Sequence, residues 1–183
     1  MSYVVTFVSR NKDNVGVKDF RPRVKNMLVD PRTNEIDSLF TDFVNKGVKG
    51  EFCRCYLAIN ETDEEKVKVA LAKFLIDEAV SPSDWNLTKI QSKVAALSSL
   101  SQNKKTKHWL FDCDCNHTTT VAFMDDILKT DPEVEILQVS PTPHGYALVV
   151  SRGFDTREIL KKYPDIELKK DSPVCLQWAR KLK

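Results

Sequence analysis

The spacing of apolar residues predicts alternating strands and helices in the first hundred residues. Alternation and short apolar runs indicate strands, whereas apolar residues three and four positions apart indicate amphipathic helices. The expected elements are a strand at 3–9, a helix at 34–47, a strand at 52–59, a helix at 62–80 and a helix after Ser81-Pro82-Ser83. Asn34 is expected to cap the first helix, and Thr62 with Glu65 forms a capping box for the second. The basic segment 10–33 contains two prolines and is expected to be an extended arm or a broken hairpin.

A more regular pattern follows residues 98–107, a stretch rich in Ser, Asn and Lys that is the best candidate for a linker. The expected elements are a strand at 108–114, a helix at 117–130, strands at 134–140 and 145–151, a helix at 155–163 and a strand at 165–169. This β-α-β-β-α-β order is that of the ferredoxin-like or RNA-recognition-like unit. The sequence therefore predicts an α+β fold. An N-terminal α/β subunit (1–100) would pack on a C-terminal ferredoxin-like unit (101–183) within one compact domain.

Charge is distributed unevenly along the 183 residues. The formal net charge of +2 is too small to indicate a nucleic-acid partner, but residues 10–32 and residues 161–183 each carry +4 and flank an acidic centre. That distribution suits a polyanionic substrate, and solvated surface charge accounts for it equally well. Five cysteines, with neither a signal peptide nor a membrane span, predict a reduced, cytoplasmic protein without a membrane partner.

The strongest chemical pattern lies where an apolar strand runs into Asp112-Cys113-Asp114. Side chains alternate along a strand, so the two aspartates share one face and Phe111 and Cys113 share the other. Two carboxylates about 7 Å apart on one strand face repel each other, and a divalent cation relieves that repulsion. The pattern predicts a Mg²⁺ or Mn²⁺ site for nucleotide phosphates. A strand end that exposes two acids to water is the alternative.

The third strand of the predicted unit lies beside the first in a ferredoxin-like sheet. His144 and Gly145, at the start of that strand, are therefore expected near the two aspartates. The sheet face without helices is where such units bind nucleotides or RNA. Tyr146 is the best candidate for stacking on a base.

A strand that ends in Phe111-Asp112-Cys113-Asp114, within a ferredoxin-like unit that follows a smaller α/β unit, resembles the archaeo-eukaryotic primase superfamily. That superfamily includes primase-polymerases and many virus and plasmid replication proteins. Its pattern is an hhDhD strand, a later Ser/Gly-x-His strand and a further strand with a third acid. Asp112 and Asp114 match the first element, and Thr142 to Leu148 resembles the second. Ala147 stands where the nucleotide-binding His is expected, and His144 lies three residues earlier.

Two further parts of the chain fit the resemblance, which covers residues from about 50 onward. Arg54-Cys55-Tyr56 looks like the Arg-x-Tyr strand of the upstream subunit in some phage members. The third acid would be Asp171, with Asp165 and Glu167 as other choices.

The resemblance implies a metal-dependent nucleotidyltransferase that acts on nucleic acid and a nucleoside triphosphate. Asp112, Asp114 and Asp171 would be catalytic, with Asp112 and Asp114 binding Mg²⁺ or Mn²⁺. The implied nucleotide-binding residues are Arg54, His144, Tyr146, Lys169 and Lys170. A phage member would act in the host cytoplasm, with a replication or host protein as a further partner. A catalytically inactive relative that binds nucleic acid or a host protein would have nearly the same sequence.

Other chemistries use parts of the same residues. Asp112-x-Asp114 also resembles the opening motif of haloacid-dehalogenase-type phosphatases, but Asn116 stands where they have Thr and about 70 residues remain for their later elements. Cys53-x-Cys55 and Cys113-x-Cys115 suggest a Cys₄ zinc site, although small buried residues explain cysteines within strands better. His117-Thr118-Thr119 is similar to the His-x-Thr of two-histidine phosphodiesterases, whose second motif this chain lacks.

Overall fold

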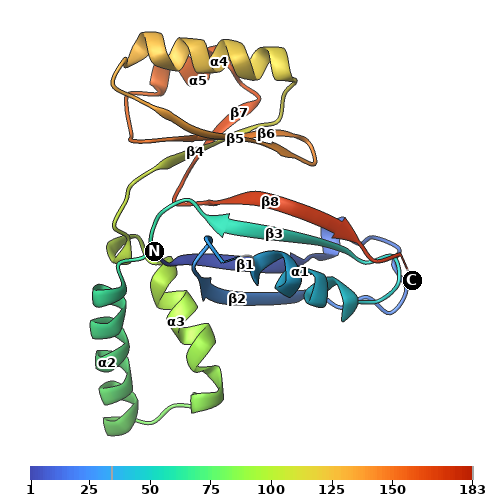
Figure 1. The fold of residues 1–183 in the computed structure, drawn as a ribbon, viewed down its shortest axis with the longest axis vertical. Helices are drawn as coiled ribbons and strands as arrows, with labels where there is room; N and C mark the ends of the chain where they lie inside the picture. The colour runs from blue at the N-terminus through green and yellow to red at the C-terminus, as the bar shows by residue number, and fades with distance from the viewer. Residues whose placement is uncertain (34, 183) are drawn as a thin grey trace.

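The computed structural model describes residues 1–33 and 35–182, and these residues form an α+β fold of two antiparallel four-stranded sheets and five α-helices (Figure 1). The strands are β1 (Tyr3–Ser9), β2 (Arg23–Val29), β3 (Phe52–Ala58), β4 (Trp109–Cys113), β5 (Ile136–Thr142), β6 (Gly145–Val150), β7 (Ile166–Lys170) and β8 (Pro173–Arg180). The helices are α1 (Glu35–Asn45), α2 (Glu64–Val80), α3 (Ile90–Ser99), α4 (His117–Thr130) and α5 (Arg157–Lys162). Short 3₁₀ turns occupy Asn11–Asp13, Leu87–Lys89 and Ser101–Asn103. The α+β class expected from the sequence is confirmed.

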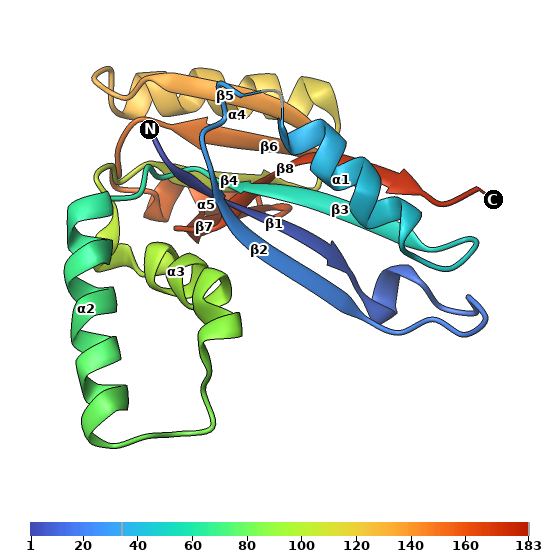
Figure 2. The same ribbon diagram turned by 60° about the horizontal axis from the view of Figure 1, so that its bottom comes forward.

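The first sheet has the strand order β2-β1-β3-β8, and α1 lies across one of its faces (Figure 2). Helical spacing places Ile36, Phe40 and Phe43 on one side of α1, where they meet the alternate apolar residues of β1 and β3. Phe7, fully buried in β1, contacts the rings of Phe40 and Phe43 with centroids 5.4 and 5.7 Å away. These contacts form the core of the first sheet.

The second sheet has the order β5-β6-β4-β7, so β4 and β6 are neighbours at its centre, as the sequence predicts. Helices α4 and α5 cover one face (Figure 1). Phe111 of β4 is fully buried there, and its ring meets that of Phe123 edge to face with centroids 5.2 Å apart. The opposite face is turned toward the first sheet, where Leu110, Ala147 and Val149 pack with Ile59 and Val174 in a smaller core.

The last strand joins the two halves. β8 follows β7 in the chain, yet it pairs antiparallel with β3 and completes the first sheet. Asp171, with φ 58°, lies in the turn between β7 and β8, and Asp tolerates this left-handed conformation better than most residues. The expected boundary at residue 100 assigns residues 173–180 to the second unit, whereas their hydrogen bonds are made within the first sheet.

Several element boundaries differ from those expected. The N-cap of α2 is Asp63, which accepts a hydrogen bond from the Lys66 N–H at 3.3 Å, and not Thr62. Thr62 is instead held in an isolated bridge with Lys104. β5 begins at Ile136 because Val134 lies in a turn, where its N–H donates to the Asp131 carbonyl. The predicted cap Asn34 lies outside the described residues.

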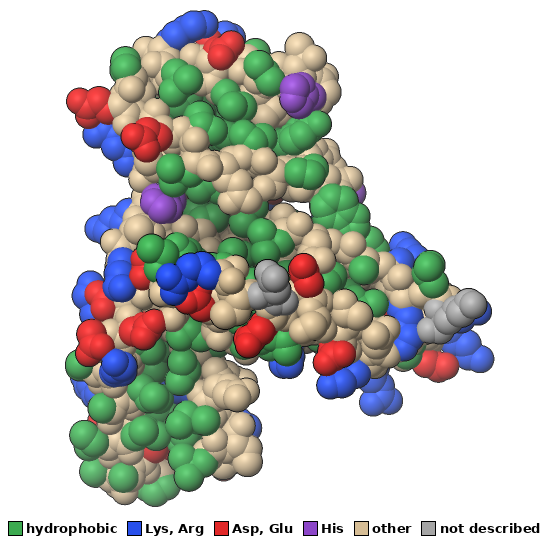
Figure 3. Space-filling view, in the orientation of Figure 1, with side chains coloured by type: hydrophobic (Ala, Val, Ile, Leu, Met, Phe, Trp, Pro, Cys, Tyr) green, Lys and Arg blue, Asp and Glu red, His purple; other side chains and the backbone are tan. Residues whose placement is uncertain are grey.

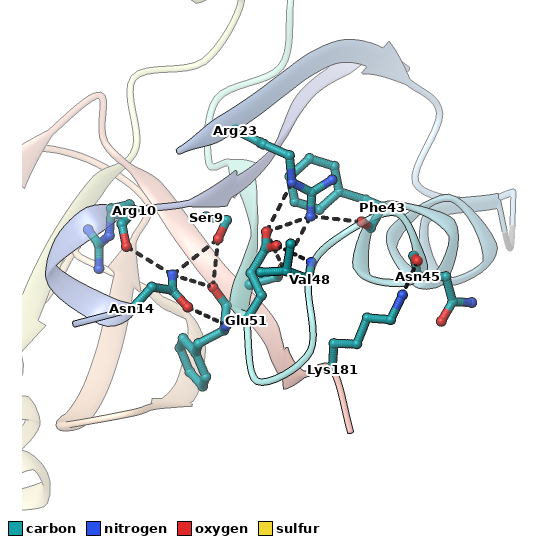
Figure 4. A network of polar contacts seen from close by, with 11 residues as sticks. Ser9, Arg10, Asn14, Arg23, Phe43, Asn45, Val48, Glu51 and Lys181 are labelled. Atoms are coloured by element: carbon teal, nitrogen blue, oxygen red, sulfur yellow. Dashed lines mark hydrogen bonds and ion pairs between the residues drawn. The ribbon is translucent and has the colours of Figure 1, made fainter. Parts of the chain in front are cut away.

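Of the two forms expected for residues 10–33, an extended arm or a broken hairpin, the structure shows a hairpin, since β2 pairs with β1 along its whole length. A polar network holds this hairpin to the start of β3 (Figure 4). Asn14 donates to the Phe52 carbonyl at 3.0 Å, and Glu51 accepts hydrogen bonds from Arg23 Nη2 at 2.6 Å and the Val48 N–H at 2.8 Å. Because Glu51 is only 1% exposed, water does not solvate its carboxylate, and these hydrogen-bond partners stabilise the charged form instead.

Helices α2 and α3 project from the sheets as a pair (Figures 1 and 2). Their surface carries many apolar side chains (Figure 3), and Val69, Ile76 and Val80 of α2 are more than half exposed. Among the described helices, none combines the length and apolarity needed to cross a membrane.

Candidate functional site

A cleft of about 520 Å³ lies where the helix-free face of the second sheet meets the first sheet. The second sheet contributes charged and apolar side chains to one wall, and the first sheet contributes basic side chains to the other. The lining residues are Arg10, Lys12, Asp13, Arg54, Tyr56, Leu110, Asp112, Asp114, Thr142, Pro143, His144, Ala147, Lys169, Ser172, Pro173 and Cys175.

Strand alternation places the first aspartate of the motif in this cleft. Leu110 and Asp112 face the cleft, whereas Phe111 and Cys113 point into the core beneath the helices. Asp114 follows the end of β4, and its N–H donates to the Asp165 carbonyl at 3.0 Å. Both carboxylates therefore line one cavity, as the sequence predicts.

The turn between β5 and β6 brings His144 to the same cleft. Thr142 Oγ1 accepts a hydrogen bond from the Gly145 N–H at 3.1 Å, which shapes the turn. A Cβ atom at Gly145 would lie 2.1 Å from the Cys113 carbonyl oxygen, so a larger residue cannot occupy this position without moving the backbone. Gly145 thus permits the close approach of β6 to the end of the aspartate strand.

We expect Gly145→Ala to separate β6 from β4 at Cys113 and to displace the segment that carries Asp112 and Asp114. The overlap is with backbone, so the loss of stability should be about 1–3 kcal/mol, the usual cost of overpacking. Urea denaturation measures this loss. Gly50→Ala is the matched control, because a Cβ there meets nothing within 4 Å and only its φ of +85° is unfavourable. The strain at Gly50 should itself cost about 1–2 kcal/mol, so a loss well below 1 kcal/mol for Gly145→Ala is the result that would contradict the packing role of Gly145.

Asp112 is paired with a lysine from the neighbouring strand. Lys169 Nζ forms an ion pair with Asp112 and lies 3.4 Å from Glu167. The hydrogen bond to Asp112 raises the pKa of Lys169, so this lysine stays charged at neutral pH. Glu167 stands directly opposite Asp112 in the β4–β7 register.

The expected third acid, Asp171, does not line this cleft. Its Oδ1 accepts a hydrogen bond from Asn60 Nδ2 at 3.0 Å, and its Oδ2 accepts one from Ser101. It lines a separate cavity at the other end of β4. Glu167, the acid opposite Asp112, is closer to the motif in the sheet register than Asp171. A residue in the turn after β7 cannot reach the far end of β4, so the placement corrects the choice of Asp171.

The first sheet provides an ion-paired cluster that sequence reasoning found only in part. Arg54 Nη2 lies 2.7 Å from Asp13 Oδ1, and Arg10 Nε lies 2.8 Å from Asp13 Oδ2. Burial raises the pKa of Asp13, but the hydrogen bonds from both arginines outweigh it and leave the pKa below its usual value. Arg54 was predicted as a binding residue. The sequence analysis does not predict Arg10, Lys12 and Asp13 as binding residues. The excess of basic residues in 10–32 is the only feature of the sequence that indicates this wall of the cleft.

Arg54 retains an unused donor. The residue is 9% exposed, and its Nε has no hydrogen-bond partner among the residues that the structure describes. Its guanidinium lies over the ring of Phe52, 5.4 Å from the centroid. A buried guanidinium with a free N–H is suited to an anionic ligand.

Two predicted nucleotide-binding residues face away from the cleft. Tyr146 pairs with Cys113, so it shares the helix-covered face and packs edge to face with His117 at 5.6 Å. Lys170 pairs with Trp109 on that same face, with its Nζ 4.2 Å from the centroid of the indole. Neither side chain is brought together with Asp112 and Asp114. Arg54, His144 and Lys169 do line the cleft together with the two aspartates.

The two Cys-x-Cys pairs lie in different cores. Cys53 and Cys55 belong to the core beneath α1, whereas Cys113 belongs to the core beneath α4 and α5. Burial raises the pKa of the Cys53 thiol to about 11 and those of Cys55 and Cys113 to about 12. Because zinc binds thiolates from one shared site, this separation does not fit a Cys₄ centre.

The donor set of the cleft suits a metal ion that arrives with a phosphate ligand. Within residues 1–33 and 35–182, no group of three or more His, Cys, Asp or Glu side chains is placed to hold a metal by itself. Mg²⁺ is commonly held by one or two carboxylates, with substrate phosphates and water completing its coordination. Asp112 and Asp114 are two carboxylates of that kind, and a metal ion at Asp112 would have to displace its ion pair with Lys169.

Comparison of the chain with known protein families, with curated proteins and with solved structures finds no match. The geometry of the cleft therefore carries the functional argument.

Proposed function

We propose that the chain binds a nucleoside triphosphate and nucleic acid in the cleft and acts as a metal-dependent nucleotidyltransferase of the primase-polymerase type. The observation that carries this proposal is the meeting of Asp112 and Asp114 with Arg54, His144 and Lys169, residues that are far apart in the sequence, in one cavity. The order β5-β6-β4-β7, with α4 and α5 on one face, supports a ferredoxin-like assignment for the second sheet.

Each residue has a defined task in this proposal. Asp112 and Asp114 would hold Mg²⁺ or Mn²⁺, which would neutralise the triphosphate and activate a 3′-hydroxyl. Lys169 would transfer its hydrogen bond from Asp112 to a phosphate oxygen. The free Nε–H of Arg54 would donate to a second phosphate oxygen while Asp13 holds the guanidinium in place. His144, at the rim, would contact the nucleotide.

A second candidate is a non-catalytic relative that binds nucleic acid or a host protein through the same unit. Two observations favour it. Lys169 forms an ion pair with Asp112, and Ala147 stands directly opposite Asp112, at the position where the primase superfamily is expected to have a nucleotide-binding His. In this case the cleft would bind phosphates through its basic residues and need no metal. Either function fits the cytoplasm, of a host cell if the protein is encoded by a phage.

Calorimetric titration of ATP and dATP with and without Mn²⁺ tests the proposal. The native chain should bind nucleotide more tightly with Mn²⁺, and Asp112→Asn/Asp114→Asn should lose at least about tenfold in affinity, which corresponds to about 1.4 kcal/mol. Asp77→Asn/Asp125→Asn makes the same change of charge at two exposed helix positions and should bind like the native chain.

The two candidates differ in outcome. Binding that needs both Mn²⁺ and the two aspartates supports the nucleotidyltransferase and leads to primer-synthesis assays. Absence of Mn²⁺-dependent nucleotide binding by the native chain contradicts it. Metal-independent binding of a single-stranded oligonucleotide would then support the non-catalytic relative.

A further inference from the structure

A second cavity, of about 460 Å³, lies at the start of β4, at the opposite end of the strand from Asp112 and Asp114. Four lysines from three different parts of the chain line it: Lys66 of α2, Lys104 and Lys107 of the segment before β4, and Lys170 of β7. Asp171 is the acidic residue among its lining side chains. None of the residues that line this cavity lines the cleft.

Lys104 is the unusual member of this group. It is only 7% exposed, and its Nζ has no hydrogen-bond partner within the described part of the chain. The nearby carboxylate of Asp171 accepts its hydrogen bonds from Asn60 and Ser101 instead. A buried ammonium without an acceptor is costly, because it has lost its hydrogen bonds to water and no hydrogen bond replaces them.

The backbone fixes Lys104 in this position. Lys104 forms a β-bridge with Thr62, and its N–H donates to the Ser101 carbonyl at 3.2 Å. The neighbouring Asn103 carbonyl accepts from the Asp63 N–H at 2.8 Å, and the Lys105 N–H donates to the Glu61 carbonyl at 2.8 Å. The side chain is therefore held at the cavity by ordered structure on both sides.

The chemistry of the walls favours a small, highly charged anion. Four lysines and one carboxylate line the cavity, and Lys66 is also ion-paired with Asp63 at 3.4 Å, so the walls keep an excess of positive charge. Trp109 does not offer an open face to a base, because Lys170 lies over its ring and Phe154 packs beside it with centroids 6.3 Å apart. An oxyanion therefore suits the walls of this cavity better than an aromatic group does.

We infer that this cavity binds a phosphate group, either free or within the backbone of a nucleic acid, and that Lys104 Nζ is its central hydrogen-bond donor. Lys66, Lys107 and Lys170 contribute positive charge around it. Burial lowers the pKa of Lys104 while the charge of Asp171 opposes that effect, and a bound anion would favour the charged form further.

Thermal unfolding in phosphate and in chloride, at equal ionic strength and pH 7, tests the inference. A ligand that binds only the folded state raises the unfolding midpoint with its concentration. Lys104→Met keeps the aliphatic side chain and removes the charge, so the phosphate-dependent rise should be lost. Lys161→Met, at an exposed position of α5, should retain it. The difference between the two variants is the readout, because phosphate also stabilises proteins by exclusion from their surface.

An equal rise in Lys104→Met and Lys161→Met would overturn the inference. If Lys104→Met does not fold, Lys107→Met changes an exposed lysine of the same cavity. That variant should need several times more phosphate for the same rise, and an unchanged response would overturn the inference.

Titration with a short oligothymidylate distinguishes the source of the phosphate. Stabilisation by the oligonucleotide that Lys104→Met abolishes supports a phosphodiester ligand, and stabilisation by inorganic phosphate alone supports a free phosphate. The variant Asp112→Asn/Asp114→Asn should retain the phosphate response, so failure of the proposed nucleotidyltransferase would leave this result unaffected.

Discussion

Replacing Phe111 by Ala is expected to lower the free energy of unfolding by about 3–5 kcal/mol, the usual cost of removing a buried aromatic side chain. Phe111 is fully buried at the centre of the second sheet, where its ring contacts Phe123 at 5.2 Å and Phe154 at 6.0 Å. Urea denaturation followed by circular dichroism measures the change.

A matched truncation on the surface controls for this prediction. Val121→Ala removes apolar atoms from α4 at a position that is 41% exposed, and it should cost less than about 1 kcal/mol. A loss of similar size for Phe111→Ala would contradict the assignment of Phe111 to the core. Such a result would also weaken the argument for Asp112, because the alternation that buries Phe111 is what directs Asp112 into the cleft.

Replacing Glu51 by Ala should lower the free energy of unfolding by about 3 kcal/mol, near the lower end for breaking a buried ion pair. The substitution removes the carboxylate that accepts from Arg23 and from the Val48 N–H, and leaves Arg23 with its hydrogen bond to the Phe43 carbonyl at 3.1 Å (Figure 4). The lower end applies because Arg23 is 27% exposed and water can reach it. Glu51 ties the β1–β2 hairpin to β3, so the loss should also loosen the wall of the cleft that carries Arg10 and Asp13.

The same carboxylate gives the stability a pH dependence. Burial raises the pKa of Glu51, but the hydrogen bonds from Arg23 and Val48 outweigh burial and leave the pKa below its usual value. The stabilisation is therefore complete above about pH 4.5, the ordinary value for Glu, and is lost as the pH falls through the folded-state pKa. Denaturation of the native chain between pH 6 and about pH 3 should show this loss.

Glu51→Gln should reduce this dependence, because the amide keeps an acceptor oxygen and cannot titrate. Glu158→Gln is the control, since Glu158 is 86% exposed and its pair with Lys161 contributes little. If Glu51→Gln and Glu158→Gln lose stability with acid to the same extent as the native chain, Glu51 is not the group responsible.

Local patterns determined much of the fold. The helix predicted at 117–130 coincides with α4, and the strand predicted at 3–9 coincides with β1. Asn116 caps α4 through a hydrogen bond with the Thr119 N–H at 2.9 Å, which is a contact between residues close in the chain. Such elements depend on interactions over a few residues, and the sequence encodes those directly.

Strand alternation also determined which residues of β4 face alike, but it could not determine which neighbours join them. The sequence predicts Lys169, Lys170 and Tyr146 in one site, but the side chains of Lys170 and Tyr146 point to the face of the second sheet that lies away from the cleft. The strand register decides this. Lys169 pairs with Leu110, which faces the cleft, whereas Tyr146 pairs with Cys113, which faces the core beneath the helices.

Contacts between distant segments were decided by tertiary structure alone. The return of β8 to the first sheet, the meeting of Arg10 and Asp13 with Asp112, and the burial of Lys104 all join residues that are tens of positions apart. No local periodicity records such partners, because their pairing follows from how the two sheets pack their apolar faces. The sequence by itself therefore determined the α+β elements and the Asp-x-Asp strand. Only the packing of the two sheets determined the cleft and the second cavity.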